Sequence, residues 1–144
     1  MNIIELFQKA QQKLYKPKFI FESCDMKIKI HIAAKAHYPN FPNYLYISKA
    51  ETGDYLGKFL KTGEMILQPN IPDKLKEDLV IIKNDPIEFG KLYGQKYSFC
   101  CFCGTEIVTK ESLTAGYGPI CAEKWGLPWG SIFDENISKE ELMP

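Results

Sequence analysis

The stretch Met26-Lys27-Ile28-Lys29-Ile30-His31-Ile32 decides the fold class of this chain. Apolar residues occupy every second position, and basic residues occupy the positions between them. Successive side chains of a β-strand point to opposite faces of a sheet, so this alternation predicts a strand with one buried and one solvated face. The solvated face would carry Lys27, Lys29 and His31.

Further β-rich runs lie on both sides of this strand. Phe19 and Phe21 precede it, and residues 44–47, 55–60 and 64–68 follow it, separated by a loop at 39–43 and turns at 51–54 and 61–63. Short connections between consecutive strands are typical of antiparallel pairing. The sequence therefore predicts an antiparallel meander.

Three segments have the apolar spacing of helices. The first helix is predicted at residues 3–14: Asn2 and Glu5 form a capping-box pattern at its start, and Pro17 limits its end. Pro72 and Pro86 suit the first positions of two further helices, and Asp85 gives the second one a capping signal. We expect an α+β fold: an N-terminal antiparallel sheet with flanking helices in residues 1–96, a small metal module in 97–130 and an acidic tail in 131–144.

The chain of 144 residues has no net charge, but its charges are unevenly distributed. Residues 1–62 hold ten lysines against five acidic residues, and residues 63–144 hold eight lysines against thirteen acidic residues. Arginine, which reads guanine and clamps phosphate with two parallel hydrogen bonds, is absent. The start of the chain lacks a signal-peptide pattern, and no apolar run is long enough to span a bilayer, so we expect a cytoplasmic protein with no membrane partner.

Four of the five cysteines fall in a short window, at positions 100, 101, 103 and 121. Cys100 and Cys103 form a C-x-x-C pair followed by Gly104, a spacing that lets two thiolates converge on one ion. Pro119 can open a helix whose first turn would hold Cys121. A cysteine pair in a hairpin and a third cysteine at a helix start are typical of a treble-clef-like or zinc-ribbon-like module that binds Zn²⁺.

A closed structural zinc site needs a fourth ligand. Cys101 is the nearest candidate in sequence, although adjacent hairpin residues usually point apart, and Cys24, His31 or His37 could reach over from the first part of the chain. Buried free thiols and a disulfide are the alternatives to a metal site. Neither histidine is close in sequence to a cysteine of this window, so we predict no catalytic residues and no enzyme activity.

Residues 100–129 resemble an uncharacterised family of short phage and mobile-element proteins that carry a C-terminal CxxCG…S…GYGPxCA…GLPW module. The residues that match this pattern include Ser112, Gly116, Gly118, Pro119 and Cys121. Residues 32–39, 46–47 and 55–58 are similar to the family's N-terminal strands. The resemblance implies a metal module and a phage or mobile-element origin, and it implies no particular activity.

Two further features suggest binding surfaces. Lys27, Lys29, His31 and Lys35 lie near Tyr38, Phe41, Tyr44 and Tyr46, and basic residues interleaved with aromatic rings can bind single-stranded nucleic acid weakly. A solvated strand face beside core aromatics is the alternative. Trp125 and Trp129 could form an exposed protein-binding patch, or they could cover the thin core of the metal module.

These features leave two function classes open. The first is a non-enzymatic zinc protein that binds nucleic acid or a nucleic-acid-processing complex. The second is a protein-binding inhibitor of a host enzyme or defence system. The basic strand favours the first, whereas the missing arginine and the acidic second half favour the second, because negative charge repels phosphate.

Overall fold

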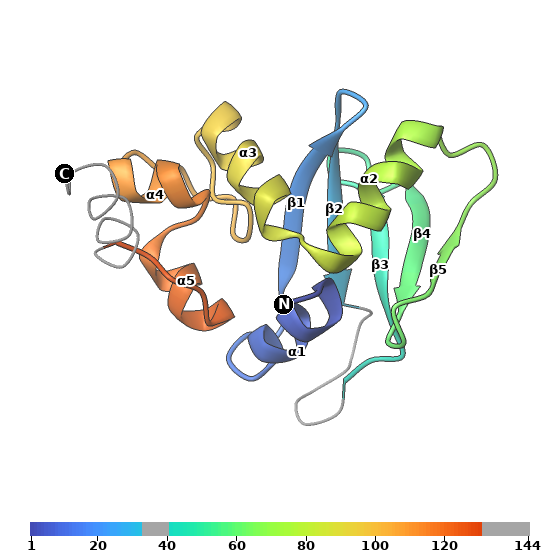
Figure 1. The fold of residues 1–144 in the computed structure, drawn as a ribbon, viewed down its shortest axis with the longest axis horizontal. Helices are drawn as coiled ribbons and strands as arrows, with labels where there is room; N and C mark the ends of the chain where they lie inside the picture. The colour runs from blue at the N-terminus through green and yellow to red at the C-terminus, as the bar shows by residue number, and fades with distance from the viewer. Residues whose placement is uncertain (33–40, 131–144) are drawn as a thin grey trace.

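The computed structural model describes residues 1–32 and 41–130, which form a β-sheet covered by helices (Figure 1). The strands are β1 (Lys18–Ser23), β2 (Met26–Ile32), β3 (Tyr44–Lys49), β4 (Tyr55–Leu60) and β5 (Met65–Leu67). The helices are α1 (Ile3–Gln11), α2 (Asp73–Asn84), α3 (Ile87–Tyr97), α4 (Lys110–Ala115) and α5 (Pro119–Trp125).

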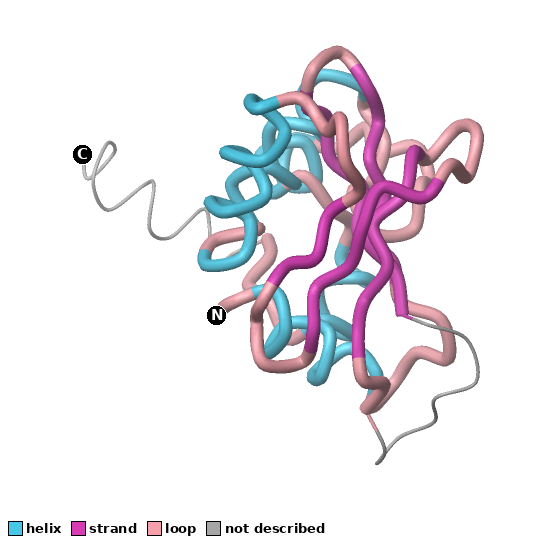
Figure 2. Tube along the Cα trace, turned by 90° about the vertical axis from the view of Figure 1, so that its right-hand side faces the viewer, coloured by secondary structure: helices cyan, strands magenta, loops and turns pink. Residues whose placement is uncertain are grey.

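The sheet is an antiparallel meander in which the strands follow one another in chain order. Ile28 and Ile30 of β2 are fully buried, and the basic residues that alternate with them are half-buried, as the alternation in the sequence predicts. The helices lie on one side of the sheet (Figure 2). The predicted α+β fold is therefore confirmed.

The helix ends differ slightly from the prediction. The capping box of Asn2 and Glu5 is present, but α1 ends at Gln11 rather than at residue 14, because the N–H groups of Gln12 and Lys13 bond to carbonyls only three residues back and tighten the last turn. Pro72 and Pro86 each stand one residue before the helix, at its N-cap. Asp85 is the C-cap of α2 and not the N-cap of α3, which has no side-chain capping hydrogen bond, so the capping signal assigned to Asp85 is wrong.

One hydrophobic core joins the sheet to the cysteine segment. Phe102 stacks on Trp125 with ring centroids 4.1 Å apart, and Trp125 contacts Phe7 of α1 edge to face at 5.0 Å. Trp125 is 1% exposed, so the suggestion that it belongs to an exposed protein-binding patch is wrong. Its ring instead fills the space between α1, α5 and the cysteine segment, which is the alternative that the sequence left open.

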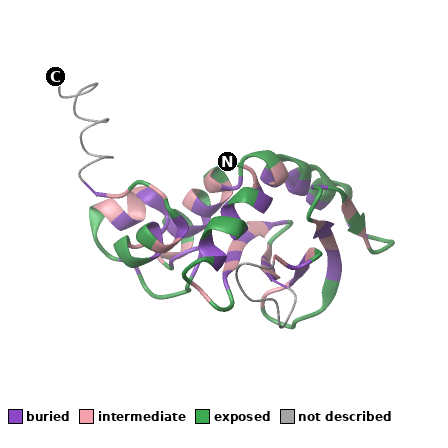
Figure 3. Cartoon of the chain, turned by 90° about the horizontal axis from the view of Figure 1, so that it is seen from below, coloured by how far each residue is buried: buried purple, intermediate pink, exposed green. Residues whose placement is uncertain are grey.

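On each helix, the residues that face the core are buried and those on the opposite side are exposed (Figure 3). None of the helices in the described ranges is long and apolar enough to cross a membrane. Lys35, His37 and the acidic segment 131–144 lie outside the described residues, and so do residues 39 and 40 of the loop predicted at 39–43.

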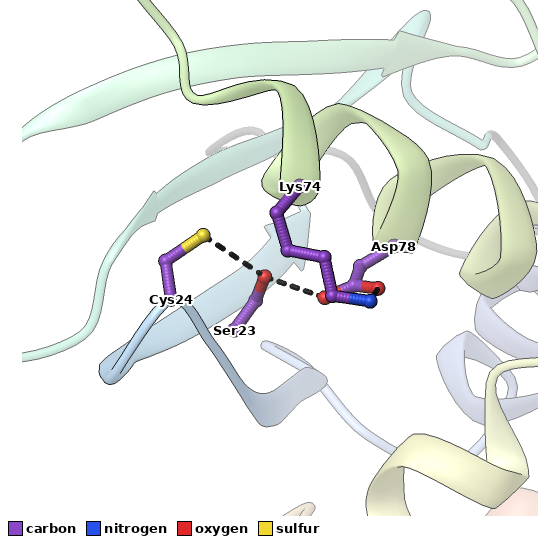
Figure 4. A network of polar contacts seen from close by, with 4 residues as sticks. All are labelled: Ser23, Cys24, Lys74 and Asp78. Atoms are coloured by element: carbon purple, nitrogen blue, oxygen red, sulfur yellow. Dashed lines mark hydrogen bonds and ion pairs between the residues drawn. The ribbon is translucent and has the colours of Figure 1, made fainter.

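A polar network ties α2 to the β1–β2 hairpin (Figure 4). Asp78, which is 4% exposed, accepts a hydrogen bond of 2.7 Å from the Ser23 hydroxyl and pairs with Lys74 at 3.1 Å. The hairpin turns through Cys24 and Asp25, both of which have positive φ. Cys24 Sγ lies 3.7 Å from Ser23 Oγ, so this cysteine belongs to the hairpin network.

Candidate metal centre

Three cysteine sulfur atoms converge in the C-terminal part of the molecule. The Sγ atoms of Cys100, Cys103 and Cys121 all lie within 4.8 Å of one another. Cys100 and Cys121 are buried, and Cys103 is exposed. All five cysteines of the chain are free thiols, so the disulfide alternative is not present in this structure.

A tight turn brings the first two sulfur atoms together. The Cys100 N–H bonds to the Thr105 carbonyl at 2.8 Å, and the Gly104 N–H bonds back to the Cys100 carbonyl at 2.9 Å. Gly104 adopts φ +78°, a conformation that side chains rarely adopt, so a glycine suits this position. The turn also directs the N–H groups of Phe102 and Cys103 toward Cys100 Sγ, at 3.4 and 3.5 Å.

The third sulfur atom comes from the first turn of α5. Gly118 is the N-cap of this helix, Pro119 is its first residue and Cys121 is its third. The sequence predicted this helix start, but it missed α4, which is six residues long and carries Thr109 as its N-cap. The Thr109 side chain accepts a hydrogen bond from the Ser112 N–H, which is the local signal that could have revealed this helix.

The pKa values of the Cys100 and Cys121 thiols are shifted in opposite directions. The pKa of Cys100 is lowered, first by a hydrogen bond from the Cys121 thiol and then by backbone N–H groups that point at its sulfur. The same hydrogen bond, together with burial, raises the pKa of Cys121. These directions favour the thiolate at Cys100 and the thiol at Cys121, and a metal ion bound by both would displace the proton of that thiol.

The spacing of the three sulfur atoms fits a tetrahedral metal site. With Zn–S bonds of about 2.3 Å, ligand sulfur atoms stand roughly 3.8 Å apart. The cysteine group therefore needs to contract by no more than about one ångström to bind zinc. A set of soft thiolate ligands suits Zn²⁺, Cu⁺ or an iron–sulfur cluster, and it does not suit Mg²⁺ or Ca²⁺.

Cys101 points away from this group. Its sulfur lies in the core, where a methyl group added at Gly90 of α3 would come within 2.8 Å of it, and burial raises its pKa well above the usual value. Gly94, one turn further along α3, has a similarly close neighbour: a methyl group there would meet Gly116 Cα at 2.5 Å. Because Gly116 precedes α5 by three residues, these close contacts position the helix that supplies Cys121.

Residues 90–126 match the model of DUF6011, a family of unknown function. The matched segment begins at Gly90, contains the three clustered cysteines and ends at Gly126, directly after α5. No curated protein and no solved structure matches this chain significantly.

The DUF6011 match starts seven residues before the predicted module, which was placed at 97–130. The additional residues form the part of α3 that holds Gly90 and Gly94. Two glycines four residues apart inside an apolar helical pattern indicate a close helix contact, and this signal was available in the sequence. The cysteine cluster, most of α3 and all of α5 therefore lie within the matched segment.

Among the described residues, the cysteine group has three members. The other candidates for a fourth ligand lie elsewhere: Cys24 is in the β1–β2 hairpin, and His31 Nε2 lies 3.0 Å from Ser48 Oγ on the sheet. Burial, followed by the neighbouring charge of Lys29, lowers the pKa of His31. The acidic residue nearest in sequence to Cys121, Glu123, forms an ion pair with Lys13, which lies in the turn after α1.

A groove of about 460 Å³ adjoins the three cysteines. Ile107, Val108 and Ile120 line it together with the cysteines, and Val108 and Ile120 are 73% and 71% exposed. Trp129, the other tryptophan predicted to bind protein, is half-buried and donates a hydrogen bond from Nε1 to Ser112 Oγ at 3.3 Å.

Three of the four basic residues predicted to bind nucleic acid are described, and they lie on the side of the sheet that faces away from the helices, which we call the open face. Lys27, Lys29 and His31 point to it from β2. The neighbouring strands add residues that the sequence did not assign to this surface, and the half-buried or exposed ones among them are Lys18, Ile20, Glu22, Tyr44, Tyr46, Tyr55, Lys58 and Leu60.

Proposed function

We propose that this chain is a non-enzymatic zinc protein of a phage or mobile element that binds nucleic acid through the open face of its sheet. Cys100, Cys103 and Cys121 would hold one zinc ion in a structural role. The convergence of these three sulfur atoms within 4.8 Å is the observation that carries the metal assignment. The resemblance of residues 100–129 to phage and mobile-element proteins supports the proposed origin.

The chemistry of the cysteine cluster favours a structural ion. Three thiolates supply much negative charge to the metal, which weakens its ability to activate a bound water. Glu123, the acidic residue closest to Cys121 in sequence, is paired with Lys13 in the turn after α1. The Phe102 ring, inserted between Phe19 and Trp125, makes the cysteine turn part of the core.

Metal analysis of the purified protein tests the zinc assignment. We expect about one equivalent of zinc per chain, and less than roughly half an equivalent would contradict the proposal. Cys103→Ser should lose the metal, and it should loosen residues 97–129, because metal binding is coupled to folding in small modules. Cys24→Ser is the matched control, since Cys24 is also exposed but lies in the hairpin network.

The charge of the open face supports nucleic acid as the partner. Four strand lysines, Lys18, Lys27, Lys29 and Lys58, point to this face, and they are accompanied by the carboxylate of Glu22. Glu22 accepts hydrogen bonds from Lys96 and Tyr97, so its charge is already paired. The face therefore presents an excess of positive charge, which a phosphate backbone would neutralise.

Binding of a labelled 15-nucleotide oligonucleotide at increasing salt tests this part of the proposal. If about three lysines contact phosphates, log K should fall with log salt at a slope of roughly −2. Lys27→Glu with Lys29→Glu should abolish binding, whereas Lys76→Glu on α2, at the other side of the sheet, should not. Undetectable binding at low salt would favour the alternative from the sequence, an inhibitor that binds a host protein.

A further inference from the structure

Three tyrosines gather on the open face in positions that the sheet register creates. Tyr44 and Tyr46 come from β3 and Tyr55 comes from β4. The ring centroids of Tyr44 and Tyr46 are 5.2 Å apart, and those of Tyr46 and Tyr55 are 5.9 Å apart. His31 extends the cluster onto β2, where its ring lies 5.6 Å from that of Tyr46.

Tyr46 lies at the centre of this cluster, because its strand β3 is placed between β2 and β4, and both of these strands carry basic residues on the open face. It stands opposite His31 of β2 and opposite Lys58 of β4. A β-bulge after Ile47 shifts the pairing so that Ser48 opposes Tyr55, which places the Tyr55 ring beside Tyr46. The cluster thus spans three adjacent strands, and Tyr55 at its edge is 42% exposed.

Cations stand directly beside these rings. The Lys58 ammonium lies 4.3 Å from the centroid of the Tyr44 ring, and Lys29 points to the same face from β2. An aromatic surface bordered by lysines suits a ligand that carries both flat apolar rings and regularly spaced negative charges. A single strand of nucleic acid has both, because its bases are free to stack and its phosphates are exposed.

We infer that the tyrosine cluster of the open face binds single-stranded nucleic acid, with unpaired bases stacking on Tyr46 and Tyr55 and with Lys29 and Lys58 contacting the phosphates. This inference rests on the proposed function and names its substrate class. A duplex keeps its bases stacked inside the helix, so it offers the rings only its backbone. Because the chain has no arginine, the bidentate arginine contact to guanine is not available, and we expect little sequence preference.

The decisive experiment compares single-stranded DNA, single-stranded RNA and a DNA duplex of the same sequence by fluorescence anisotropy at low salt. Wild-type protein should bind at least one of the single strands about 10-fold or more tightly than the duplex, and Tyr46→Ala should weaken that binding by a similar factor. Tyr46→Phe keeps the ring and should keep the affinity. Phe99→Ala removes an exposed aromatic ring outside the strands and should have no effect.

The outcomes separate this inference from the proposed function. Equal affinity for duplex and single strand, or unchanged binding by Tyr46→Ala when Lys27→Glu with Lys29→Glu still abolishes it, would overturn base stacking and leave the nucleic-acid function intact. Absence of binding to all three probes would overturn both. A thermal melt of each variant shows whether it is folded, and a Tyr46→Phe variant that is folded but binds as weakly as Tyr46→Ala would also contradict the inference.

Discussion

Replacing Gly94 by alanine tests whether the glycine face of α3 positions the cysteine cluster. The added methyl group would lie 2.5 Å from Gly116 Cα and 2.8 Å from the Gly116 carbonyl oxygen. Ordinary contacts of this kind are about an ångström longer, and both neighbours are backbone atoms, which cannot swing aside as a side chain can. Either α3 or the segment before α5 must therefore shift.

The magnitude follows from two opposing effects. Overpacking of a well-packed contact costs about 1–3 kcal/mol. Alanine favours a helix interior over glycine by up to about 1 kcal/mol, which offsets part of that cost. Since the clash is close and involves backbone atoms, we expect Gly94→Ala to lower the free energy of unfolding by about 1–2 kcal/mol. Zinc affinity should fall as well, because the displaced segment carries Cys121.

Urea denaturation with tryptophan fluorescence measures the stability of the variant, and competition with a zinc chelator measures its metal affinity. Leu92→Ala is the control, because Leu92 lies on the same helix but is 54% exposed. A Gly94→Ala protein that is as stable as the wild type, or more stable, would refute the argument from close contact. A destabilised variant with unchanged zinc affinity would show that the glycine face does not position Cys121.

Three other predictions concern the core, the hairpin network and acid stability. Trp125→Ala should lower the free energy of unfolding by about 3–5 kcal/mol, and Trp125→Phe should cost less, because the Trp125 N–H has no acceptor among the described residues; urea denaturation compares the two. Asp78→Ala should cost about 1–3 kcal/mol, since the buried Ser23 hydroxyl would lose its acceptor, and a thermal melt would show the loss. Hydrogen bonds from Lys96 and Tyr97 lower the pKa of the Glu22 carboxyl below its ordinary value, so the stability that this carboxylate contributes is present above the ordinary pKa and is lost as the pH falls through the lowered one. The difference in the free energy of unfolding between wild type and Glu22→Gln should therefore shrink as the pH falls below about 4.

The strands were predictable because their signal is local. The alternation in residues 26–32 identifies both the strand and its solvated face, and the structure places Lys27, Lys29 and His31 on that face. The tyrosine cluster was not predictable in the same way. It depends on the register between β2, β3 and β4 and on the bulge after Ile47, and a shift of one residue would have moved the rings to the other face.

In the cysteine segment, too, local features could be predicted from the sequence and features that depend on packing could not. Spacing alone indicated that Cys100, Cys103 and Cys121 form a group, but it could not assign Cys101, whose direction depends on how the turn packs against α3. The six-residue helix α4 is too short to give a clear periodic signal. Trp125 looked like a surface residue or a core residue from sequence, and only its contacts with Phe102 and Phe7 decide between the two.

The two halves of the proposed function are connected through the backbone of Cys101. Its carbonyl accepts a hydrogen bond from the Ile20 N–H of β1 at 2.7 Å, and its N–H donates to the Gly116 carbonyl at 3.0 Å. One residue thus joins the edge of the sheet to the segment that presents Cys121. Since Ile20 stands opposite Lys29 on the open face, a metal ion that fixes the cysteine turn would also fix the edge strand beside the basic residues. In the proposed function, a structural zinc ion would therefore support nucleic-acid binding indirectly, by holding the edge strand in place, without touching the ligand.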